Sequence, residues 1–353
     1  MKPVYLAGRG LACALGVTVK TSLTALSQGS DTAATRVLPG ESTPCFPYRA
    51  MADVQGDWNE RACTLIQRVA LEAGAEQARN GALFIATSSF DIGAMEQGAA
   101  AMDYQDFADK LASWLQWRGP VYVLSTACTS SLNAMMAAQA LLRSGEVEDA
   151  LVLGVELSNQ LTLGGFAALQ LLSPGRCKPF GRDRDGLVLG EAVAALRFST
   201  REASIWRMRG GANVVEGQQP TSASAPAVVS MYQKALANCD LAAEAIDLIK
   251  VQAAGSPGND AIEAQGLRDS FEVVPPLVSL KTAIGHTMGA SGAAEVALLT
   301  ACLEHGVWPT YADAVDETLG VHLVTHAPAS VRCFMASILG FGGGHATVIL
   351  ERA

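Results

Sequence analysis

The chain has 353 residues, of which half are apolar and 17% are charged. This composition excludes a disordered chain, and the length excludes a small domain that needs disulfides for stability. The formal net charge is −9, so there is no excess of basic residues to bind nucleic acid. The length is typical of about two domains, or of one large fold built in two parts.

The N-terminus begins with an apolar run, VYLAGRGLACALGV, that contains Arg9. A charge inside such a run disfavours a signal peptide, and no stretch reaches the ~18 apolar residues of a membrane span. The eight cysteines are scattered, without a CxxC pair or zinc-ligand spacing, which is typical of reduced thiols. We therefore expect a cytoplasmic protein without a membrane association.

Short apolar runs alternate with longer Ala-rich helical patterns along the chain. Residues 4–8 predict a first buried strand that ends in a glycine turn at Gly10, and residues 28–60 predict an irregular surface loop region. Further strands are predicted at residues 81–87, 121–125, 150–155, 192–198, 248–253, 277–280 and 333–338. Short strands with helical crossovers indicate an α/β fold whose sheets are covered on both faces.

Two segments follow the same pattern of a strand end, a tight turn and a helix rich in small residues. The first runs over residues 125–142 and carries Cys128, and the second runs over residues 281–299 and carries His286. Each places one reactive side chain at the junction between a strand and a helix. We interpret the chain as two similar halves that divide near residue 200.

Cys128 is the candidate nucleophile. A thiol at the start of a helix lies near exposed N–H groups and the positive helix end, which lower its pKa. Thr129 and Ser130 are small enough to admit a long, thin substrate. The alternative is a buried structural cysteine beside a helix start.

Lys281 and His286 lie five residues apart around Gly285. Histidine is the usual proton carrier or hydrogen-bond donor near neutral pH, and a nearby lysine can fix its tautomer. The alternative is a structural histidine whose hydrogen bonds are already satisfied.

Two loops complete the set of motifs. Residues 178–191 carry Asp185 among several neighbouring arginines and aspartates, which favours a network that braces a loop beside a site over a solvated turn. Residues 338–345 form a glycine turn after a strand, and consecutive glycines allow backbone N–H groups to approach an oxyanion.

Together these motifs resemble those of the β-ketoacyl-acyl carrier protein synthases, the condensing enzymes of the thiolase fold. The most specific matches are TACTSS around Cys128, PFGRDRDGLVLGE at 179–191, KTAIGHTMGASGAAE at 281–295 and LGFGGGHA at 339–346. They occur in the family's order and span nearly the whole chain. The resemblance implies an α/β, five-layered αβαβα fold, with an N-terminal half at 1–200 and a C-terminal half at 201–353.

The resemblance also implies a reaction: acyl transfer from a carrier protein to Cys128, then decarboxylative Claisen condensation with a malonyl thioester in fatty acid or polyketide chain elongation. A soft thiol nucleophile suits a thioester substrate. By the resemblance, Lys281 is the active-site lysine, His286 is the second family histidine, and the N–H groups of Cys128 and Phe341 form the oxyanion hole. Supporting roles are expected for Glu263, Glu295, Asp185 and His345.

The sequence departs from the family at the first histidine, where Ala254 stands, and the loop from there to Asp260 is about two residues shorter than usual. His345 replaces an asparagine in the terminal glycine motif and could assist His286. Leu339 occupies the position of a gating phenylalanine in elongating synthases. Loss of one oxyanion donor typically lowers the rate by about 10²–10³-fold. Cys128 could therefore still be acylated while condensation is slow or absent.

Three functions therefore stay open. The first is a ketosynthase that elongates acyl chains. The second is a chain-length-factor-like subunit of a heterodimeric ketosynthase, as in aryl-polyene-type pathways, although such subunits usually lack the cysteine that is present here. The third is a thiolase-fold acyltransferase or thioesterase that does not decarboxylate.

The expected partners are an acyl carrier protein, charged with acyl and malonyl groups, and a second ketosynthase subunit in a homodimer or heterodimer. Carrier proteins are acidic, so binding to a chain of net charge −9 needs a local basic patch. Arg201, Arg207 and Arg209 are candidates for it. No metal, nucleotide or flavin is expected, because Gly8-Arg-Gly10 does not continue into a dinucleotide fingerprint.

Overall fold

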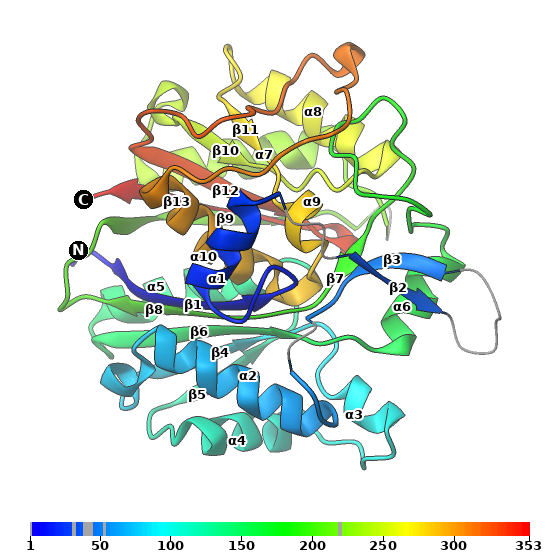
Figure 1. Cartoon of the computed structure of the whole chain (residues 1–353). Coiled ribbons are helices and arrows are strands. Elements are labelled where there is room, and N and C mark those ends of the chain that lie inside the picture. Colours follow the sequence, from blue (N-terminus) through cyan, green and yellow to red (C-terminus); the bar gives the residue numbers. More distant parts are fainter. Residues whose placement is uncertain (1, 30–32, 38–44, 52–53, 218–220) are drawn as a thin grey trace.

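The computed structural model describes residues 2–29, 33–37, 45–51, 54–217 and 221–353. Ten strands of this part of the chain form one sheet in the order β11-β10-β12-β13-β9-β1-β8-β6-β4-β5 (Figure 1). In chain order these strands are β1 Tyr5–Cys13, β4 Ala82–Ala86, β5 Val121–Leu124, β6 Asp149–Glu156, β8 Ala192–Ser199, β9 Trp206–Val215, β10 Leu248–Lys250, β11 Leu277–Val278, β12 Cys333–Leu339 and β13 Gly344–Arg352.

The sheet consists of two similar halves. From the outer edge inward, each half places its third, second, fourth, fifth and first strand side by side. The pairings also agree, because β4 is parallel to β5 and β6, as β10 is to β11 and β12, and the remaining neighbours are antiparallel. The halves join through one residue pair, Tyr5 in β1 opposite Arg207 in β9.

Helices cover both faces of each half-sheet. Helices α2 (Trp58–Glu72) and α4 (Tyr104–Leu115) pack on the outer face of the first half, and α7 (Ala225–Cys239) and α8 (Pro257–Ser270) on the outer face of the second half. Helices α5 (Ser130–Ser144) and α10 (Ser291–His305) lie between the two half-sheets in the largest apolar core (Figure 1). This order of layers confirms the predicted five-layered α/β fold of two similar halves. The division at residue 200 falls between β8 and β9, and its use as a domain boundary stays a prediction.

The helices contain 15 residues or fewer in the described part of the chain. Their bounds are α1 Val19–Ser27, α2 Trp58–Glu72, α3 Ile92–Glu96, α4 Tyr104–Leu115, α5 Ser130–Ser144, α6 Gln160–Ala168, α7 Ala225–Cys239, α8 Pro257–Ser270, α9 Lys281–Ile284 and α10 Ser291–His305. Among them, none is both long enough and apolar enough to cross a membrane.

The predicted loop region at 28–60 is wrong in part. The described residues there include β2 (Ala33–Val37) and β3 (Cys45–Arg49), and α2 begins at Trp58. Strand β2 pairs with β3, and β3 pairs in parallel with β7 (Leu189–Gly190). The strand partner lies about 140 residues away in the sequence, so local composition gave no sign of it. The rest of the predicted loop at 30–32, 38–44 and 52–53 lies outside the described residues.

The predicted turn at Gly10 is also wrong, because β1 continues to Cys13. A Cβ atom on Gly10 would lie 2.0 Å from the carbonyl oxygen of Val69, and one on Gly8 would lie 2.1 Å from that of Ala73. The two glycines therefore serve the contact between β1 and α2 rather than a change of chain direction. Within the ten-stranded sheet, β9 and β13 have no counterpart in the sequence prediction.

We predict that Gly10→Ala lowers the free energy of unfolding by at least about 1–3 kcal/mol, because the added methyl group collides with rigid helix backbone. Urea unfolding followed by circular dichroism measures this change. Gly164→Ala is the matched control, since its Cβ would meet open space in α6 and alanine favours the helix by roughly 0.5–1 kcal/mol. Equal stability of the two variants would contradict the close-packing interpretation.

Candidate active site

Cys128 lies in a tight turn between β5 and α5. Ala127 before it has φ +52°, a conformation that non-glycine residues rarely adopt. The Ser130 hydroxyl braces the turn, because it accepts a hydrogen bond from the Thr126 N–H (2.9 Å) and donates one to the Ala127 carbonyl (2.6 Å). The thiol is thus held at the junction between strand and helix, where only 5% of the residue is exposed.

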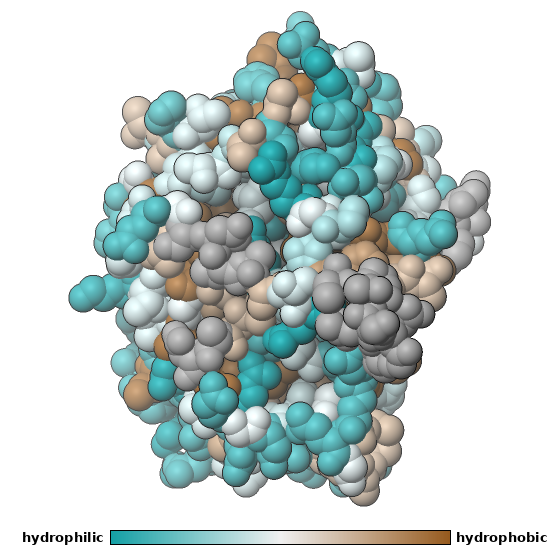
Figure 2. Space-filling view, turned by 45° about the vertical axis from the view of Figure 1, so that its right-hand side comes forward, coloured by the Kyte–Doolittle hydropathy of each residue, from teal (hydrophilic) through white to brown (hydrophobic). Residues whose placement is uncertain are grey.

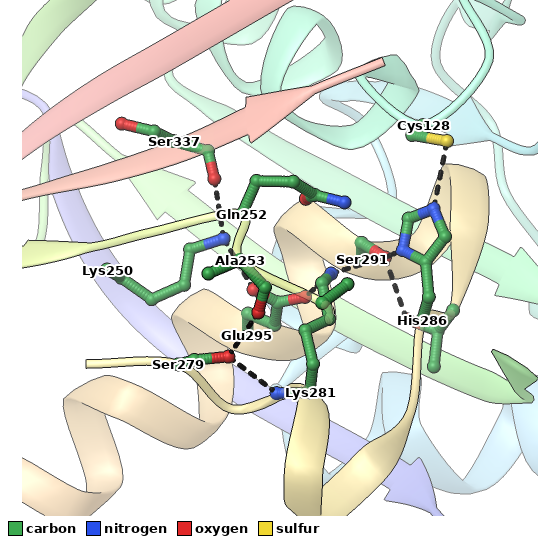
Figure 3. Close-up of polar contacts among 12 residues, drawn as sticks. Cys128, Lys250, Gln252, Ala253, Ser279, Lys281, His286, Ser291, Glu295 and Ser337 are labelled. Atoms are coloured by element: carbon green, nitrogen blue, oxygen red, sulfur yellow. Dashed lines mark hydrogen bonds and ion pairs between the residues drawn. The ribbon is translucent and has the colours of Figure 1, made fainter. Parts of the chain in front are cut away.

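His286 approaches the thiol from the second half of the chain. Its Nε2 lies 3.0 Å from Sγ of Cys128, and its Nδ1 lies 3.2 Å from Oγ of Ser291 (Figure 3). The backbone of His286 is fixed by the 187–190 loop, since its N–H donates to Val188 O (2.8 Å) and its carbonyl accepts from the Gly190 N–H (3.0 Å). The motif at 179–191 therefore positions the histidine.

Below His286, one carboxylate binds two lysines. Glu295 forms ion pairs with both Lys281 and Lys250, and all three side chains are fully or almost fully buried (Figure 3). Lys281 Nζ also donates to Ser291 Oγ (3.3 Å), and Lys250 Nζ donates to the Ser337 carbonyl (2.7 Å). Two positive charges and one negative charge thus lie beneath the imidazole.

These surroundings set the charge state of the pair. Burial, together with the charges of Lys281 and Lys250, lowers the pKa of His286 well below its usual value. Burial raises the pKa of Cys128 to about 11, against the opposing effects of Lys281 and of the Phe341 N–H. The expected lowering of the Cys128 pKa is therefore wrong, because desolvation outweighs the helix end. At neutral pH the pair rests as a neutral thiol and a neutral imidazole.

The glycine turn after β12 lies against the start of α5. A Cβ on Gly340 would lie 3.2 Å from Thr129 Cγ2 and 3.7 Å from the Cys128 backbone nitrogen. Gly342 and Gly343 have φ +79° and +77°, so they supply the left-handed turn that returns the chain into β13. The N–H groups of Phe341 and Cys128 both interact with the sulfur, and their use as an oxyanion hole stays a prediction.

The loop around Ala254 is held by two carboxylates of α8. Asp260 accepts hydrogen bonds from the backbone N–H groups of residues 254–256 at 3.1–3.2 Å. Glu263 accepts from the N–H groups of Gln252 and Ala253, both at 2.7 Å. Burial raises the pKa of Asp260 to about 6 and that of Glu263 to about 7. The loop thus has a fixed backbone, and Ala254 contributes to the pocket wall.

These elements enclose a pocket of about 20 Å³, which is room for about one water molecule. Its wall consists of Cys128, Leu187, Gln252, Ala254, Ser256, Asn259, Asp260, Glu263, His286, Leu339 and Phe341. Six of the residues that the sequence singled out therefore meet in one place: Cys128, Ala254, Glu263, His286, Leu339 and Phe341.

The other expected site residues do not line this pocket. Lys281 and Glu295 lie beneath it and act through Ser291. Asp185 braces its own loop through Lys178 and Ser173 (2.8 and 2.7 Å). His345 is buried opposite Leu339 in the β12–β13 pair, and its ring nitrogens have no hydrogen-bond partner among the described residues.

The sequence analysis missed several residues of the site: Lys250, Gln252 and Ser291, and Ser256 and Asn259 of the pocket wall. Lys250 interrupts the apolar strand run LIKVQA, and a charge in the middle of a buried strand is a signal that could have found it. Gln252 gave no such signal, because a polar residue at a strand end is ordinary. Within the described residues, no cluster of three or more His, Cys, Asp or Glu side chains could hold a metal ion.

Comparison with known proteins gives the family. Residues 90–203 match the N-terminal domain of beta-ketoacyl synthase, and residues 209–314 match its C-terminal domain. The chain belongs to the β-ketoacyl synthase family. The recognition made from the motifs is thereby confirmed.

Among curated relatives, the polyketide synthase GfsA of Streptomyces halstedii is 30% identical in an alignment of 336 positions that covers 83% of this chain and 4% of that protein. The spectinabilin polyketide synthase system protein NorA of Streptomyces orinoci is 34% identical in an alignment of 275 positions that covers 69% of this chain and 14% of that protein. The chain thus corresponds to a small part of these relatives.

Solved structures of ketosynthases share the fold. The ketosynthase ApeO in complex with its chain length factor ApeC, from Xenorhabdus doucetiae, matches with TM-score 0.84 and 24% identity over 100% of this chain and 98% of that one. A complex of a type II polyketide acyl-carrier protein with its ketosynthase, AntDE:AntF, matches with TM-score 0.88 and 19% identity over the full length of both chains.

We predict that alkylation of Cys128 by iodoacetamide is slow at pH 7 and accelerates about tenfold per pH unit up to pH 10, because the thiolate reacts and the pKa is about 11. Peptide mass spectrometry at several pH values measures the rate, with the partly exposed Cys63 as an internal comparison. Lys281→Met should slow the reaction further by removing a positive charge. A rate that levels off below pH 9 would contradict the assigned charge state.

We predict that Lys250 makes the fold more stable as the pH rises from 8 to 10.5. Its pKa falls from 10.5 to about 8, first through burial, so over this range the unfolded chain binds a proton that the folded chain does not. Urea unfolding at pH 7.5 and 9.5 should show wild type gaining stability relative to Lys250→Met at the higher pH. The exposed Lys234 is the control. The difference in the free energy of unfolding between wild type and Lys234→Met should be the same at pH 7.5 and pH 9.5.

Proposed function

We propose that this chain accepts an acyl group from a carrier-protein thioester onto Cys128 and supports its decarboxylative condensation with a malonyl thioester. The observation that carries the proposal is the 3.0 Å contact between Sγ of Cys128 and Nε2 of His286, at the wall of a closed pocket beside two candidate oxyanion donors. A soft nucleophile, a neutral imidazole and backbone donors are what thioester exchange needs.

In the acylation step, the sulfur of Cys128 attacks the thioester carbonyl and loses its proton to the neutral His286. The oxygen of the tetrahedral intermediate takes hydrogen bonds from the N–H groups of Cys128 and Phe341. Collapse of the intermediate breaks the bond to the carrier thiol, which leaves with a proton. The low pKa of His286 keeps the imidazole available as a base.

In the condensation step, the malonyl carboxylate leaves as CO₂ and its electron pair forms an enolate. The enolate carbon attacks the acyl group on Cys128, and the sulfur leaves as a thiolate. A hydrogen bond to the enolate oxygen must then come from His286 Nε2–H, so the imidazole changes from the Nδ1–H tautomer, whose free Nε2 takes the thiol proton in the acylation step. The Ser291 hydroxyl fits both tautomers, because it can accept from Nδ1–H or donate to Nδ1. Ala254 offers no second donor of the kind found in the family, so this step is expected to be the slow one.

A second candidate function is a chain-length-factor-like subunit. Ala254 favours it, and structural neighbours include a ketosynthase with its chain length factor and the ishigamide ketosynthase/chain length factor. Strand β5 lies at the edge of the sheet with Tyr122 42% exposed, and such an edge can pair with a partner strand. The third candidate function is acyl transfer without decarboxylation, which would use the same two residues, Cys128 and His286.

We infer an acyl carrier protein and a second ketosynthase subunit as partners, in the cytoplasm. The basic patch considered from the sequence is not open, because Arg201 pairs with Asp149, and Arg207 and Arg209 both pair with Glu351. Docking of an acidic carrier protein on these three arginines would have to displace those carboxylates, so we place it elsewhere on the surface.

To test the function, the purified chain is incubated with acyl-carrier protein and then with carboxyl-labelled malonyl-carrier protein. We expect an intact-mass increase of one acyl group at Cys128, release of labelled CO₂ and a β-ketoacyl product. Cys128→Ala should abolish acylation, and Ala254→His should accelerate CO₂ release by up to about 10²–10³, the usual worth of an oxyanion donor.

The alternatives give different results in the same assay. A partner subunit is silent until a second ketosynthase is added, and a plain acyltransferase is acylated at Cys128 without CO₂ release even then. Elongation by the isolated chain that depends on Cys128 excludes the partner-subunit function. Absence of acylation under all conditions overturns the proposal.

A further inference from the structure

We infer that the side-chain amide of Gln252 donates a hydrogen bond to the carbonyl oxygen of the malonyl thioester, in the place that Ala254 leaves without a donor. The inference rests on the proposed function and adds a residue to it. Gln252 lies in the same pocket wall as Cys128, His286 and Ala254. Figure 3 shows its carboxamide reaching toward the side of the site where Cys128 and His286 lie.

The amide of Gln252 is not used by the fold. The residue is 7% exposed, and its Oε1 is buried without a hydrogen-bond partner among the described residues. A buried polar group without a partner is unfavourable for folding. The orphaned Oε1 is an acceptor, whereas the amide nitrogen points toward Cys128 and His286 without a hydrogen-bond partner among the described residues, so its N–H groups can donate to a carbonyl oxygen that arrives with the substrate (Figure 3).

The backbone of Gln252 is held in place while its amide stays uncommitted. Its N–H donates to Glu263 (2.7 Å), and the neighbouring N–H of Ala253 donates to the same carboxylate (2.7 Å). Lys250, two residues earlier, is fixed by Glu295 and by the Ser337 carbonyl. The segment is thus anchored on both sides, which gives the amide a defined position before substrate enters.

The chemistry of an amide fits this role. Gln carries two N–H donors and stays neutral at every relevant pH, and asparagine and glutamine donors serve oxyanion holes. The pocket of about 20 Å³ holds about one water molecule, which a thioester oxygen would replace. The amide donates a hydrogen bond without transferring a proton, so the acid limb of the pH profile should come from other groups.

The test compares wild type, Gln252→Met, Ala254→His and the double variant, with a partner ketosynthase added where the chain needs one. Met keeps the length and removes the donors. We expect Gln252→Met to slow CO₂ release from malonyl-carrier protein by about 10²–10³, and to change acylation of Cys128 far less. In the Ala254→His background the same change should cost less than about tenfold, because the imidazole supplies the donor.

Each other result overturns the inference. If wild type and Gln252→Met release CO₂ equally, Gln252 does not donate to the malonyl thioester. If Gln252→Met loses acylation and decarboxylation to the same extent, Gln252 serves the stability of the fold instead. The same loss in both backgrounds shows that the amide and the residue at 254 act on different groups. If wild type is acylated normally but releases no CO₂, the role of Gln252 is overturned and acyl transfer to Cys128 still holds. If wild type is not acylated, the proposed function itself is overturned.

Discussion

The site depends on one buried carboxylate. Glu295 holds Lys281 and Lys250 together in the interior, and without it two ammonium groups would lie in an apolar core, which is strongly unfavourable. Through these contacts α10 is tied to α9, to β10 and, by way of the Ser337 carbonyl, to β12. Ser291 connects this cluster to Nδ1 of His286 and so orients the imidazole. Burial first, and then the charges of the two lysines, lower the pKa of His286 and keep it neutral.

The burial that positions Cys128 and His286 also keeps both side chains uncharged. A thiol with a pKa of about 11 is a poor nucleophile at rest, and the imidazole beside it is uncharged. The proposed acylation therefore requires the substrate to raise the reactivity of the thiol, which the backbone N–H groups near the sulfur would do by binding the oxyanion.

Much of the architecture could be predicted from the sequence, because apolar strand runs and small-residue helices are local patterns. The matched turns at Cys128 and His286 indicated the two halves, and the family resemblance added four further residues of the pocket wall: Ala254, Glu263, Leu339 and Phe341. Three features could not be predicted. Strand β3 depends on β7, which is far along the chain. The Cys128 pKa depends on burial, which a helix-start argument omits. Gln252 matters only through what surrounds its side chain, and a sequence pattern does not report that.

The two similar halves of the fold carry different side chains, Cys128 and His286, at the same position. Cys128 follows the third strand of the first half, and His286 follows the third strand of the second half. The two halves thus present the same architectural position, once with Cys128 and once with His286. Neither half contains both side chains, and the 3.0 Å separation exists only when the halves are packed together. The contact between the thiol and the imidazole therefore depends on how closely the halves pack. A ligand that separated the halves by about one bond length would break this contact.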